Sequence, residues 1–221
     1  MNKETLIFVG STGLIGREVL ESLSKKDKKI YLLLRRLNNT KNENINNILF
    51  NFDSPSSEMN LPACDHLFIC IGRRLKLWEL IYIRKKDRKD HFKIEHDYIY
   101  NIAKRAKELG AKNISLISAV GANSYSSNFY LNTKGRIEES IKNLGYKNIN
   151  ILRPGHIIIN KSKSEIGLIV WLVDLFFKLV NPFLIGFLSR YRGISLKDIS
   201  IFMANKSVSG IKIFYYDDFI K

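Results

Sequence analysis

Residues 5–16 read TLIFV followed by GSTGLIG, and this stretch decides the fold. Residues 5–9 are apolar and β-prone, as expected of a short central strand that is buried on both faces. A glycine loop, residues 10–16, follows directly, and apolar side chains then recur at helical spacing up to Leu23. A second apolar stretch, residues 29–34, completes a strand–helix–strand unit of about thirty residues.

The same alternation continues along the chain. We expect further strands over residues 48–52, 66–71, 113–118 and 148–152, further helices over 91–109 and 130–144, and a surface loop over the Asn-rich stretch 38–47. The pattern predicts an α/β fold with a doubly wound, parallel Rossmann sheet and helices on both faces. We expect one domain over 1–221, in which 156–221 form a small C-terminal cap on the substrate side.

The glycine loop predicts a dinucleotide site. A pyrophosphate needs backbone N–H donors and a close approach of the main chain, and the N-terminus of the following helix adds partial positive charge. A glycine pattern alone also fits a tight turn, but here it follows a strand and opens a helix. The expected cofactor-binding residues of this loop are Gly10, Ser11, Thr12, Gly13, Leu14, Ile15 and Gly16.

Arg35 and Arg36 end the second expected strand, and no carboxylate follows before Glu43. In Rossmann folds an acidic residue at this place binds the ribose hydroxyls of NAD, whereas arginine accommodates the 2′-phosphate of NADP. Two solvated arginines at the start of a loop are the alternative. The forked guanidinium favours NADP(H) as the cofactor, with NAD(H) possible.

Ser118, Tyr130 and Lys134 are the expected catalytic residues. Tyr130 and Lys134 are four positions apart and therefore share a helix face, while Ser118 ends the preceding strand. A neighbouring ammonium and a nicotinium ring are expected to lower the pKa of the phenol, which would make it an acid or base near neutrality. Lys134 is also expected to hold the nicotinamide ribose, and Ser118 the substrate oxygen. The same spacing also arises by chance on many helices.

Composition limits the partners and the compartment. The chain has 221 residues and a formal net charge of +15, but its basic residues are scattered and no nucleic-acid-binding motif accompanies them. We therefore expect a small-molecule substrate and no nucleic acid. Cys64 and Cys70 are expected to be buried thiols in a reducing compartment, and no secretory signal is visible, so a cytoplasmic location is expected. His91, His96 and His156 are isolated from one another and from the cysteines, so we expect them at the surface or in loops and expect no metal site.

The segment 166–188 is very apolar, but it contains Asp174 and Lys178 and is interrupted at Pro182. A membrane span needs about 20 largely uncharged residues, so this pattern fits a span poorly. We expect a helix and loop packed over the active site. Contact with a membrane surface through 166–188 is the less favoured alternative.

Taken together, these motifs resemble a known family. The glycine loop, Ser118 and the Tyr130/Lys134 pair resemble the short-chain dehydrogenase/reductase superfamily in its atypical branch. Residues 116–122 (LISAVGA), 129–138 (FYLNTKGRIE) and 152–155 (LRPG) are similar to the Tat-interacting-protein-like NAD(P)H-binding oxidoreductases, and residues 95–98 and 191–192 also fit that pattern.

The resemblance implies a Rossmann fold, an NADP(H) site and an oxidoreductase of an unidentified carbonyl or alcohol. By resemblance, the adenosine half of the site is lined by Arg35, Arg36, Asp53, Cys70 and Gly72, and Pro154 and Gly155 lie by the nicotinamide. Cys70-Ile71-Gly72 departs from the Asn-Ala-Gly of the superfamily's main branch, which puts a proton relay through that asparagine in doubt. A non-catalytic NADP(H)-binding regulator or scaffold, and a membrane-peripheral accessory protein, are the alternative functions.

Overall fold

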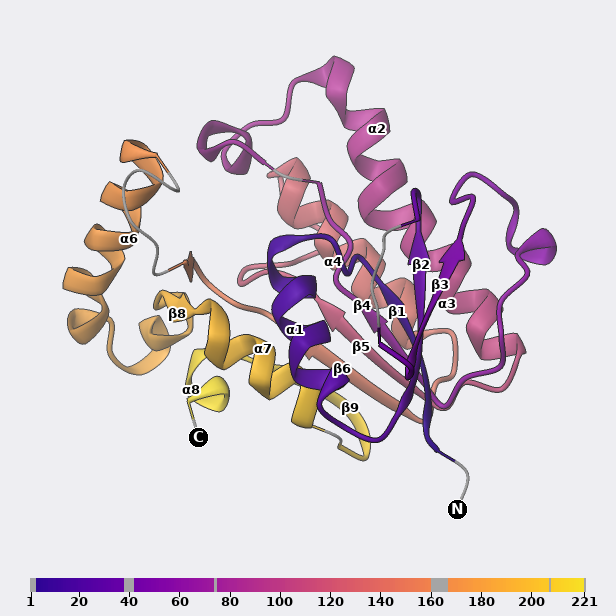
Figure 1. Cartoon of the computed structure of the whole chain (residues 1–221). Helices are drawn as coiled ribbons and strands as arrows, with labels where there is room; N and C mark the ends of the chain where they lie inside the picture. The colour runs from indigo at the N-terminus through magenta and orange to yellow at the C-terminus, as the bar shows by residue number, and fades with distance from the viewer. Residues whose placement is uncertain (1–2, 38–41, 74, 160–166, 207, 221) are drawn as a thin grey trace.

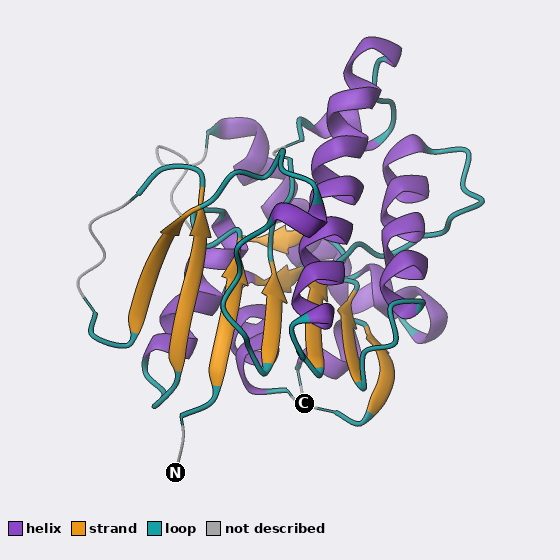
Figure 2. Ribbon diagram, turned by 90° about the vertical axis from the view of Figure 1, so that its right-hand side faces the viewer, coloured by secondary structure: helices purple, strands orange, loops and turns teal. Residues whose placement is uncertain are grey.

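The structure is a computed structural model that describes residues 3–37, 42–73, 75–159, 167–206 and 208–220. Its centre is a seven-stranded sheet in the order β3-β2-β1-β4-β5-β6-β9, with every neighbouring pair parallel (Figure 2). The strands are β1 (Thr5–Val9), β2 (Lys29–Leu34), β3 (Ile45–Leu49), β4 (His66–Ile69), β5 (Asn113–Ile117), β6 (Asn148–Leu152) and β9 (Gly210–Phe214). The strand order reverses between β1 and β4, where ligands of such sheets bind.

The two faces of β1 explain the layers. Ile7 and Val9 belong to a core shared with α3 (Tyr98–Glu108) and α4 (Phe129–Lys142), whereas Leu6 and Phe8 belong to a second core on the other face. That second core contains side chains of α1 (Leu14–Ser24) and α7 (Leu196–Asn205). Because successive side chains of a strand point to opposite faces, a fully apolar β1 requires helices on both sides. The expected doubly wound fold is confirmed (Figure 1).

Two strands differ from the expectation. β3 spans Ile45–Leu49, three residues earlier than expected, so the Asn-rich stretch is partly strand rather than loop; residues 38–41 lie outside the described part of the chain. β9 was not expected at all. β3 and β9 are the two edge strands of the sheet, and their side chains are mostly half-buried or exposed. An edge strand therefore lacks the apolar run that identifies the central strands.

One long helical segment replaces the helix expected over 91–109. It begins earlier, with α2 (Arg88–Phe92), passes through one π-helical turn (Lys93–Asp97) and continues as α3. A π turn inserts a residue into the helix and rotates the side chains that follow, and such turns are frequent at functional sites. Here the turn carries Glu95, which lies buried toward the sheet.

The C-terminal part of the chain only partly follows expectation. A two-stranded sheet pairs β7 (Ile157–Ile158) with β8 (Ile194–Ser195), and between them lie α6 (Leu168–Val180) and 3-10 helices over Asn181–Phe183 and Gly186–Tyr191. Figure 1 shows α6 apart from the main sheet, and its apolar side chains are largely exposed. The expectation that 166–188 packs over the active site is therefore wrong for α6. No described helix has the length and hydropathy needed to cross a bilayer.

The remaining short elements fill the connections between these strands and helices. They are 3-10 helices over Ser56–Glu58, Leu77–Leu80 and Lys85–Asp87, and the terminal helix α8 (Tyr216–Phe219).

The close approach of Gly16 to the glycine loop gives a stability prediction. A Cβ at Gly16 would lie 2.0 Å from the carbonyl oxygen of Gly10, whereas a Cβ at Gly13 would lie 3.3 Å from the same atom. Alanine normally stabilises a helix by about 1 kcal/mol relative to glycine. We expect the opposite for Gly16→Ala, a loss of about 2 kcal/mol or more, because backbone must move. Thermal and urea unfolding measure it.

Gly13→Ala is the matched control, since its Cβ needs only a small shift. We expect Gly13→Ala to remain within about 1 kcal/mol of the unmodified chain. Equal stability of the two variants would contradict the close approach at Gly16.

Candidate functional site

The glycine loop lies where β1 meets β4 and is held by backbone contacts. Gly10 has a φ of +87°, and a Cβ there would lie 2.5 Å from the carbonyl carbon of Cys70. The Gly13 N–H donates to the Gly10 carbonyl at 3.1 Å. Only glycine fits at position 10, because a positive φ is strained for other residues and because the backbone of Cys70 occupies the space that a Cβ would need.

The start of α1 fits an anionic group. Gly13 is the N-cap and provides no side-chain cap, and the first turn contains no acidic residue. The first N–H groups of a helix have no intrahelical acceptor, and they carry partial positive charge. Thr12 and Leu14 are exposed beside them, and the buried Ser11 hydroxyl has no hydrogen-bond partner among the described residues. Ile15 is half-buried and packs toward the core. The loop therefore fits a pyrophosphate.

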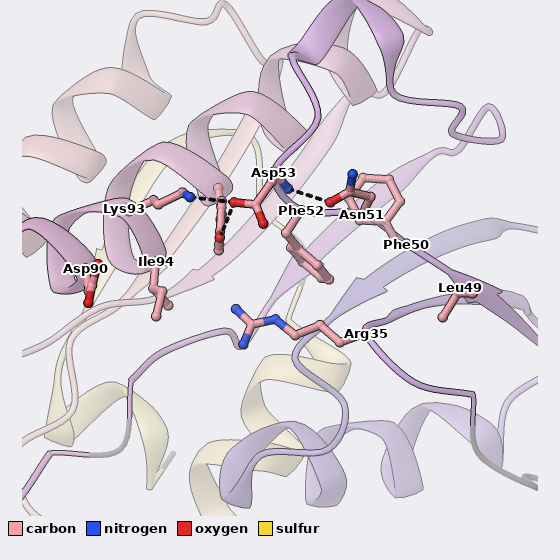
Figure 3. A pocket seen from close by; sticks show the side chains of 10 residues that line it. Arg35, Leu49, Phe50, Asn51, Phe52, Asp53, Asp90, Lys93 and Ile94 are labelled. Atoms are coloured by element: carbon pink, nitrogen blue, oxygen red, sulfur yellow. Dashed lines mark hydrogen bonds and ion pairs between the residues drawn. The ribbon is translucent and has the colours of Figure 1, made fainter.

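A cavity of about 670 Å³ opens beside the ends of β2 and β3 (Figure 3). It is lined by Arg35, Leu49, Phe50, Asn51, Phe52, Asp53, Asp90, Lys93, Ile94 and Tyr98. The Arg35 guanidinium lies 5.4 Å from the ring centre of Phe52 and 5.7 Å from that of Tyr98. This cavity combines a flat apolar wall with a cation, which suits a purine ring and a phosphate.

Asp53 lies at the mouth of this cavity and has two partners. Its carboxylate accepts from the Tyr98 hydroxyl at 2.7 Å and pairs with Lys93 at 2.6 Å (Figure 3). These two donors, Lys93 first, hold the pKa of the Asp53 carboxyl below its usual value. The structure thus brings Arg35 and Asp53 to one cavity. Arg36 is exposed just beyond Arg35 and does not line it.

Tyr130 and Lys134 lie one turn apart on α4, facing the end of β5. Lys134 is buried; its ammonium pairs with the Glu95 carboxylate at 2.7 Å and donates to the Ile117 carbonyl at 3.4 Å. Burial by itself would lower the pKa of this ammonium, but the charge and hydrogen bond of Glu95 and the nearby Tyr130 and Glu138 side chains together outweigh burial, so the pKa is raised. Lys134 is therefore a permanent cation at the carboxyl edge of the sheet.

Glu95 is a site residue that sequence reasoning did not assign. It is buried, and its Oε1 accepts from the backbone N–H of Arg73 at 2.6 Å, so it ties the end of β4 to α4 through Lys134. A Cβ at Gly72 would lie 3.2 Å from the same oxygen. The only signal in the sequence was the segment 95–98, because a π turn does not follow the helical period.

The pKa of Tyr130 departs from the expectation. Burial raises the pKa of the phenol, the Lys134 cation lowers it, and the Glu95 charge raises it again, with a net shift upward. The expected lowering of the phenol pKa by Lys134 is outweighed in this structure by burial of the phenol first, and by the Glu95 charge in addition. Tyr130 is therefore a protonated phenol at neutral pH, which makes it a proton donor rather than a base.

Ser118 takes part in a buried network. Its hydroxyl donates to the Glu138 carboxylate, which also accepts from Arg153 at 2.9 Å and 2.5 Å. Ser118 and Glu138 are both buried. The serine hydroxyl hydrogen is therefore committed to a protein acceptor, and only its oxygen lone pairs remain for a substrate. Glu138 and Arg153 were not assigned to the site from the sequence.

The remaining predicted residues lie at the same edge of the sheet. Cys70 is half-buried and its thiol donates to the Met203 sulfur at 3.6 Å. Burial raises the pKa of Cys70 far above its usual value and that of Cys64 to about 12, so both thiols are protonated. The Pro154 carbonyl accepts from the Val120 N–H at 2.9 Å, and a Cβ at Gly155 would lie 2.6 Å from the Arg192 carbonyl oxygen.

His91 differs from the expectation of a surface residue. Its imidazole is fully buried against the rings of Phe129 and Tyr130, at centroid distances of 5.8 Å and 6.1 Å. Neither ring nitrogen has a hydrogen-bond partner among the described residues, and burial lowers the pKa of the ring, which is therefore neutral. Within the described ranges, no three His, Cys, Asp or Glu side chains lie close enough together to hold a metal ion.

Several known proteins are similar to this chain in sequence. The chain is 28% identical to the protein HTATIP2 of Rattus norvegicus over 184 residues, which cover 80% of this chain and 72% of that protein. It is 32% identical to the mitochondrial protein FMP52-1 of Scheffersomyces stipitis over 170 residues, 73% of this chain and 70% of that protein. Among models of protein families, none matches the chain.

These relatives correct one expectation. The FMP52 proteins of Scheffersomyces stipitis, Candida glabrata and Saccharomyces cerevisiae are mitochondrial by name. The expected cytoplasmic location is therefore wrong as an inference from this sequence, because the absence of a recognisable secretory signal does not distinguish the cytosol from an organelle.

Solved structures share the fold. ElxO with NADP bound superposes with a TM-score of 0.71 at 18% identity, covering 96% of each chain. The human epimerase family protein SDR39U1 with NADPH gives a TM-score of 0.63 at 16% identity, covering 96% of this chain and 74% of that one. Together with the sequence relatives, the glycine loop and the Tyr130/Lys134 pair, this places the chain in the Tat-interacting-protein-like family of NAD(P)-binding, atypical short-chain dehydrogenases/reductases.

Proposed function

We propose that this protein is an NADP(H)-dependent oxidoreductase that reduces a carbonyl, or oxidises the corresponding alcohol, of a small molecule. The observation that carries the proposal is the placement of Tyr130 and Lys134 on α4 at the carboxyl edge of the sheet, the edge at which the glycine loop also lies. A proton donor and a cation are thereby held beside the place where a dinucleotide of this fold presents its nicotinamide.

The cofactor half of the proposal rests on two features. The glycine loop and the uncapped start of α1 would hold the pyrophosphate. Arg35, on the wall of the adenosine cavity, and the adjacent Arg36 would hold the 2′-phosphate, while Asp53 would accept from the adenine amine. Cys70 and Gly72 would border the ribose, and Pro154 and Gly155 the nicotinamide. NAD(H) binds the same loop but leaves Arg35 and Arg36 without a phosphate partner.

The chemistry follows from the state of Tyr130. The bound dinucleotide supplies or accepts the hydride. In reduction, the Tyr130 phenol donates its proton to the substrate oxygen, and in oxidation the phenolate takes it back. Lys134 stabilises the phenolate and would also donate to the ribose hydroxyls. Ser118 would orient the substrate through its oxygen lone pairs, because its hydrogen is donated to Glu138. A raised pKa at Tyr130 favours the reductive direction at neutral pH.

A second candidate function is a non-catalytic NADP(H)-binding regulator. The observation that favours it is the internal pairing of the polar groups, since Glu138 holds the Ser118 hydroxyl and Glu95 holds the Lys134 ammonium. A regulator needs the cofactor site but no proton donor. A screen of aldehydes and ketones for NADPH oxidation, followed by Tyr130→Phe on any substrate found, separates the two functions.

Cofactor preference gives the first prediction. If Arg35 binds the 2′-phosphate, Arg35→Ala should weaken NADPH binding by about ten- to a hundredfold, because a charge-assisted pair contributes about 1.5–3 kcal/mol. NADH affinity should change little. Calorimetric titration of both cofactors measures the change, and Lys104→Ala, which removes an exposed cation of α3, is the control. Equal losses for the two cofactors would contradict the phosphate contact.

Tyr130→Phe gives the second prediction. The substitution removes only the acidic hydroxyl, so NADPH affinity should remain unchanged while kcat falls by about 10²–10⁴. Single-turnover kinetics with a substrate from the screen measures the chemical step. Full activity of Tyr130→Phe would rule out the proton-donor role.

The Glu95 carboxylate gives the third prediction. Glu95 raises the pKa of Tyr130, so Glu95→Gln should lower it. Reduction needs the protonated phenol and is lost as the pH rises through that pKa, so the alkaline limb of the kcat profile should move to lower pH. Phenolate absorbance, with Tyr130→Phe as the blank, follows the same shift without turnover. The control is Glu139→Gln, which removes an exposed carboxylate from α4, the helix that carries Tyr130. It should leave the kcat profile and the absorbance profile unchanged.

A further inference from the structure

Helix α6 has an inverted arrangement of polar and apolar side chains. Its only buried side chain is Asp174, whose carboxylate pairs with His156 at 2.6 Å and accepts from the Ile159 backbone N–H at 3.1 Å. Phe177 stacks on the same imidazole, at a centroid distance of 4.6 Å. The Asp174 carboxylate therefore attaches the helix to the C-terminal two-stranded sheet. The face of α6 that carries Asp174 and Phe177 is the face toward this sheet.

The opposite face of α6 is apolar and exposed. It consists of Leu168, Ile169, Leu172, Leu175, Phe176 and Leu179, with exposed fractions from 38% to 66%. These positions fall within about one third of the helix circumference, the width of a core-facing stripe. Here the stripe lies on the face opposite Asp174, which contacts His156 and Ile159 at the two-stranded sheet. Figure 1 shows α6 apart from the main sheet. A surface helix of a globular protein normally has its apolar face toward the core and its polar face toward solvent.

The loop that follows α6 also exposes large apolar side chains. Phe183, Ile185, Phe187 and Leu188 are all at least half exposed. Together, the outward stripe of α6 and these four residues form what we call the α6 surface. Monomeric proteins rarely expose a contiguous apolar patch of this kind without a partner.

The exposed charge within residues 167–193 is basic. Between residues 167 and 193 the only carboxylate is the buried Asp174, while Lys178 is exposed and Arg190 and Arg192 are half-buried. Asp217, from α8, is exposed and accepts from the buried Ser189 hydroxyl, so one carboxylate lies next to the loop. Apolar side chains bordered by cations match the acyl region and the anionic headgroups of a bilayer.

We propose that the α6 surface docks this protein on an anionic membrane, with the outward side chains of α6 and of residues 183–188 inserted at the interface. The surface of a lipid bilayer fits better than a second copy of the chain. A two-fold dimer through this face would bring its lysine and arginines against their own counterparts, whereas anionic lipid neutralises them. The docking adds a location to the proposed oxidoreductase and does not depend on its activity.

Vesicle co-sedimentation of the full chain tests the proposal. Large vesicles of phosphatidylcholine alone and of phosphatidylcholine with phosphatidylglycerol are the probes. We expect the chain to pellet with the anionic vesicles and to bind the neutral ones more weakly. The double variant Leu179→Ser/Phe183→Ser, at positions 64% and 79% exposed, should reduce the partition coefficient by about tenfold or more.

The double variant Leu37→Ser/Ile81→Ser is the matched control, because its positions are 62% and 80% exposed but lie elsewhere on the chain. It should bind vesicles like the unmodified protein. In a Trp78→Phe background, Trp171 of α6 is the sole tryptophan, and its emission should shift to the blue on addition of anionic vesicles. Thermal unfolding of each variant confirms folding, and it keeps this test separate from the proposed oxidoreductase function.

Three results would overturn the proposal. The unmodified chain could stay in the supernatant with both kinds of vesicle. Leu179→Ser/Phe183→Ser could bind as tightly as the unmodified chain. Sedimentation velocity could show a dimer that this variant dissociates, without any vesicle binding, and the occupant of the surface would then be a second copy.

Discussion

Two buried ion pairs fix α4 to the carboxyl edge of the sheet, and the arrangement of the site depends on them. Lys134 pairs with Glu95 from the π-helical turn, and Glu138 pairs with Arg153 from the end of β6. All four groups are largely withdrawn from water, so each charge depends on its partner, and removal of one partner from such a pair typically costs about 3–5 kcal/mol. The pairs link β4, α3, α4 and β6 at one level of the fold.

The same pairs determine what the site can do. A lysine beside a tyrosine ordinarily lowers the pKa of the phenol, but here burial of the phenol, with the Glu95 charge in addition, raises the pKa by more. The phenol therefore stays protonated until another cation approaches. A nicotinium ring would supply that cation in the oxidative direction. In the proposed function, the charge of the bound cofactor would then shift Tyr130 between phenol and phenolate.

The sequence predicted those parts of the fold and site that rest on local patterns. Central strands such as β1 are continuously apolar, and the glycine loop needs glycine for reasons of space that hold within a dozen residues. β9 was missed because an edge strand buries little of its surface, and Glu95 because a π turn breaks the 3.6-residue period. Ser118 was identified from its place at the end of a strand, but its bond to Glu138 joins residues 20 positions apart and depends on how α4 packs.

The orientation of α6 is another feature that the local sequence pattern does not determine. The sequence shows that the segment is apolar, but the direction of its apolar face depends on the contact of Asp174 with His156, four residues beyond the end of β6. Gly155 lies between these two points and packs against the backbone of Tyr191 and Arg192, at the end of the exposed loop. The α6 surface is thus anchored to the chain that leaves the carboxyl edge of the sheet, where the proposed nicotinamide site lies. If a bilayer binds this surface, residues 153–159 connect the bound surface directly to the carboxyl end of β6.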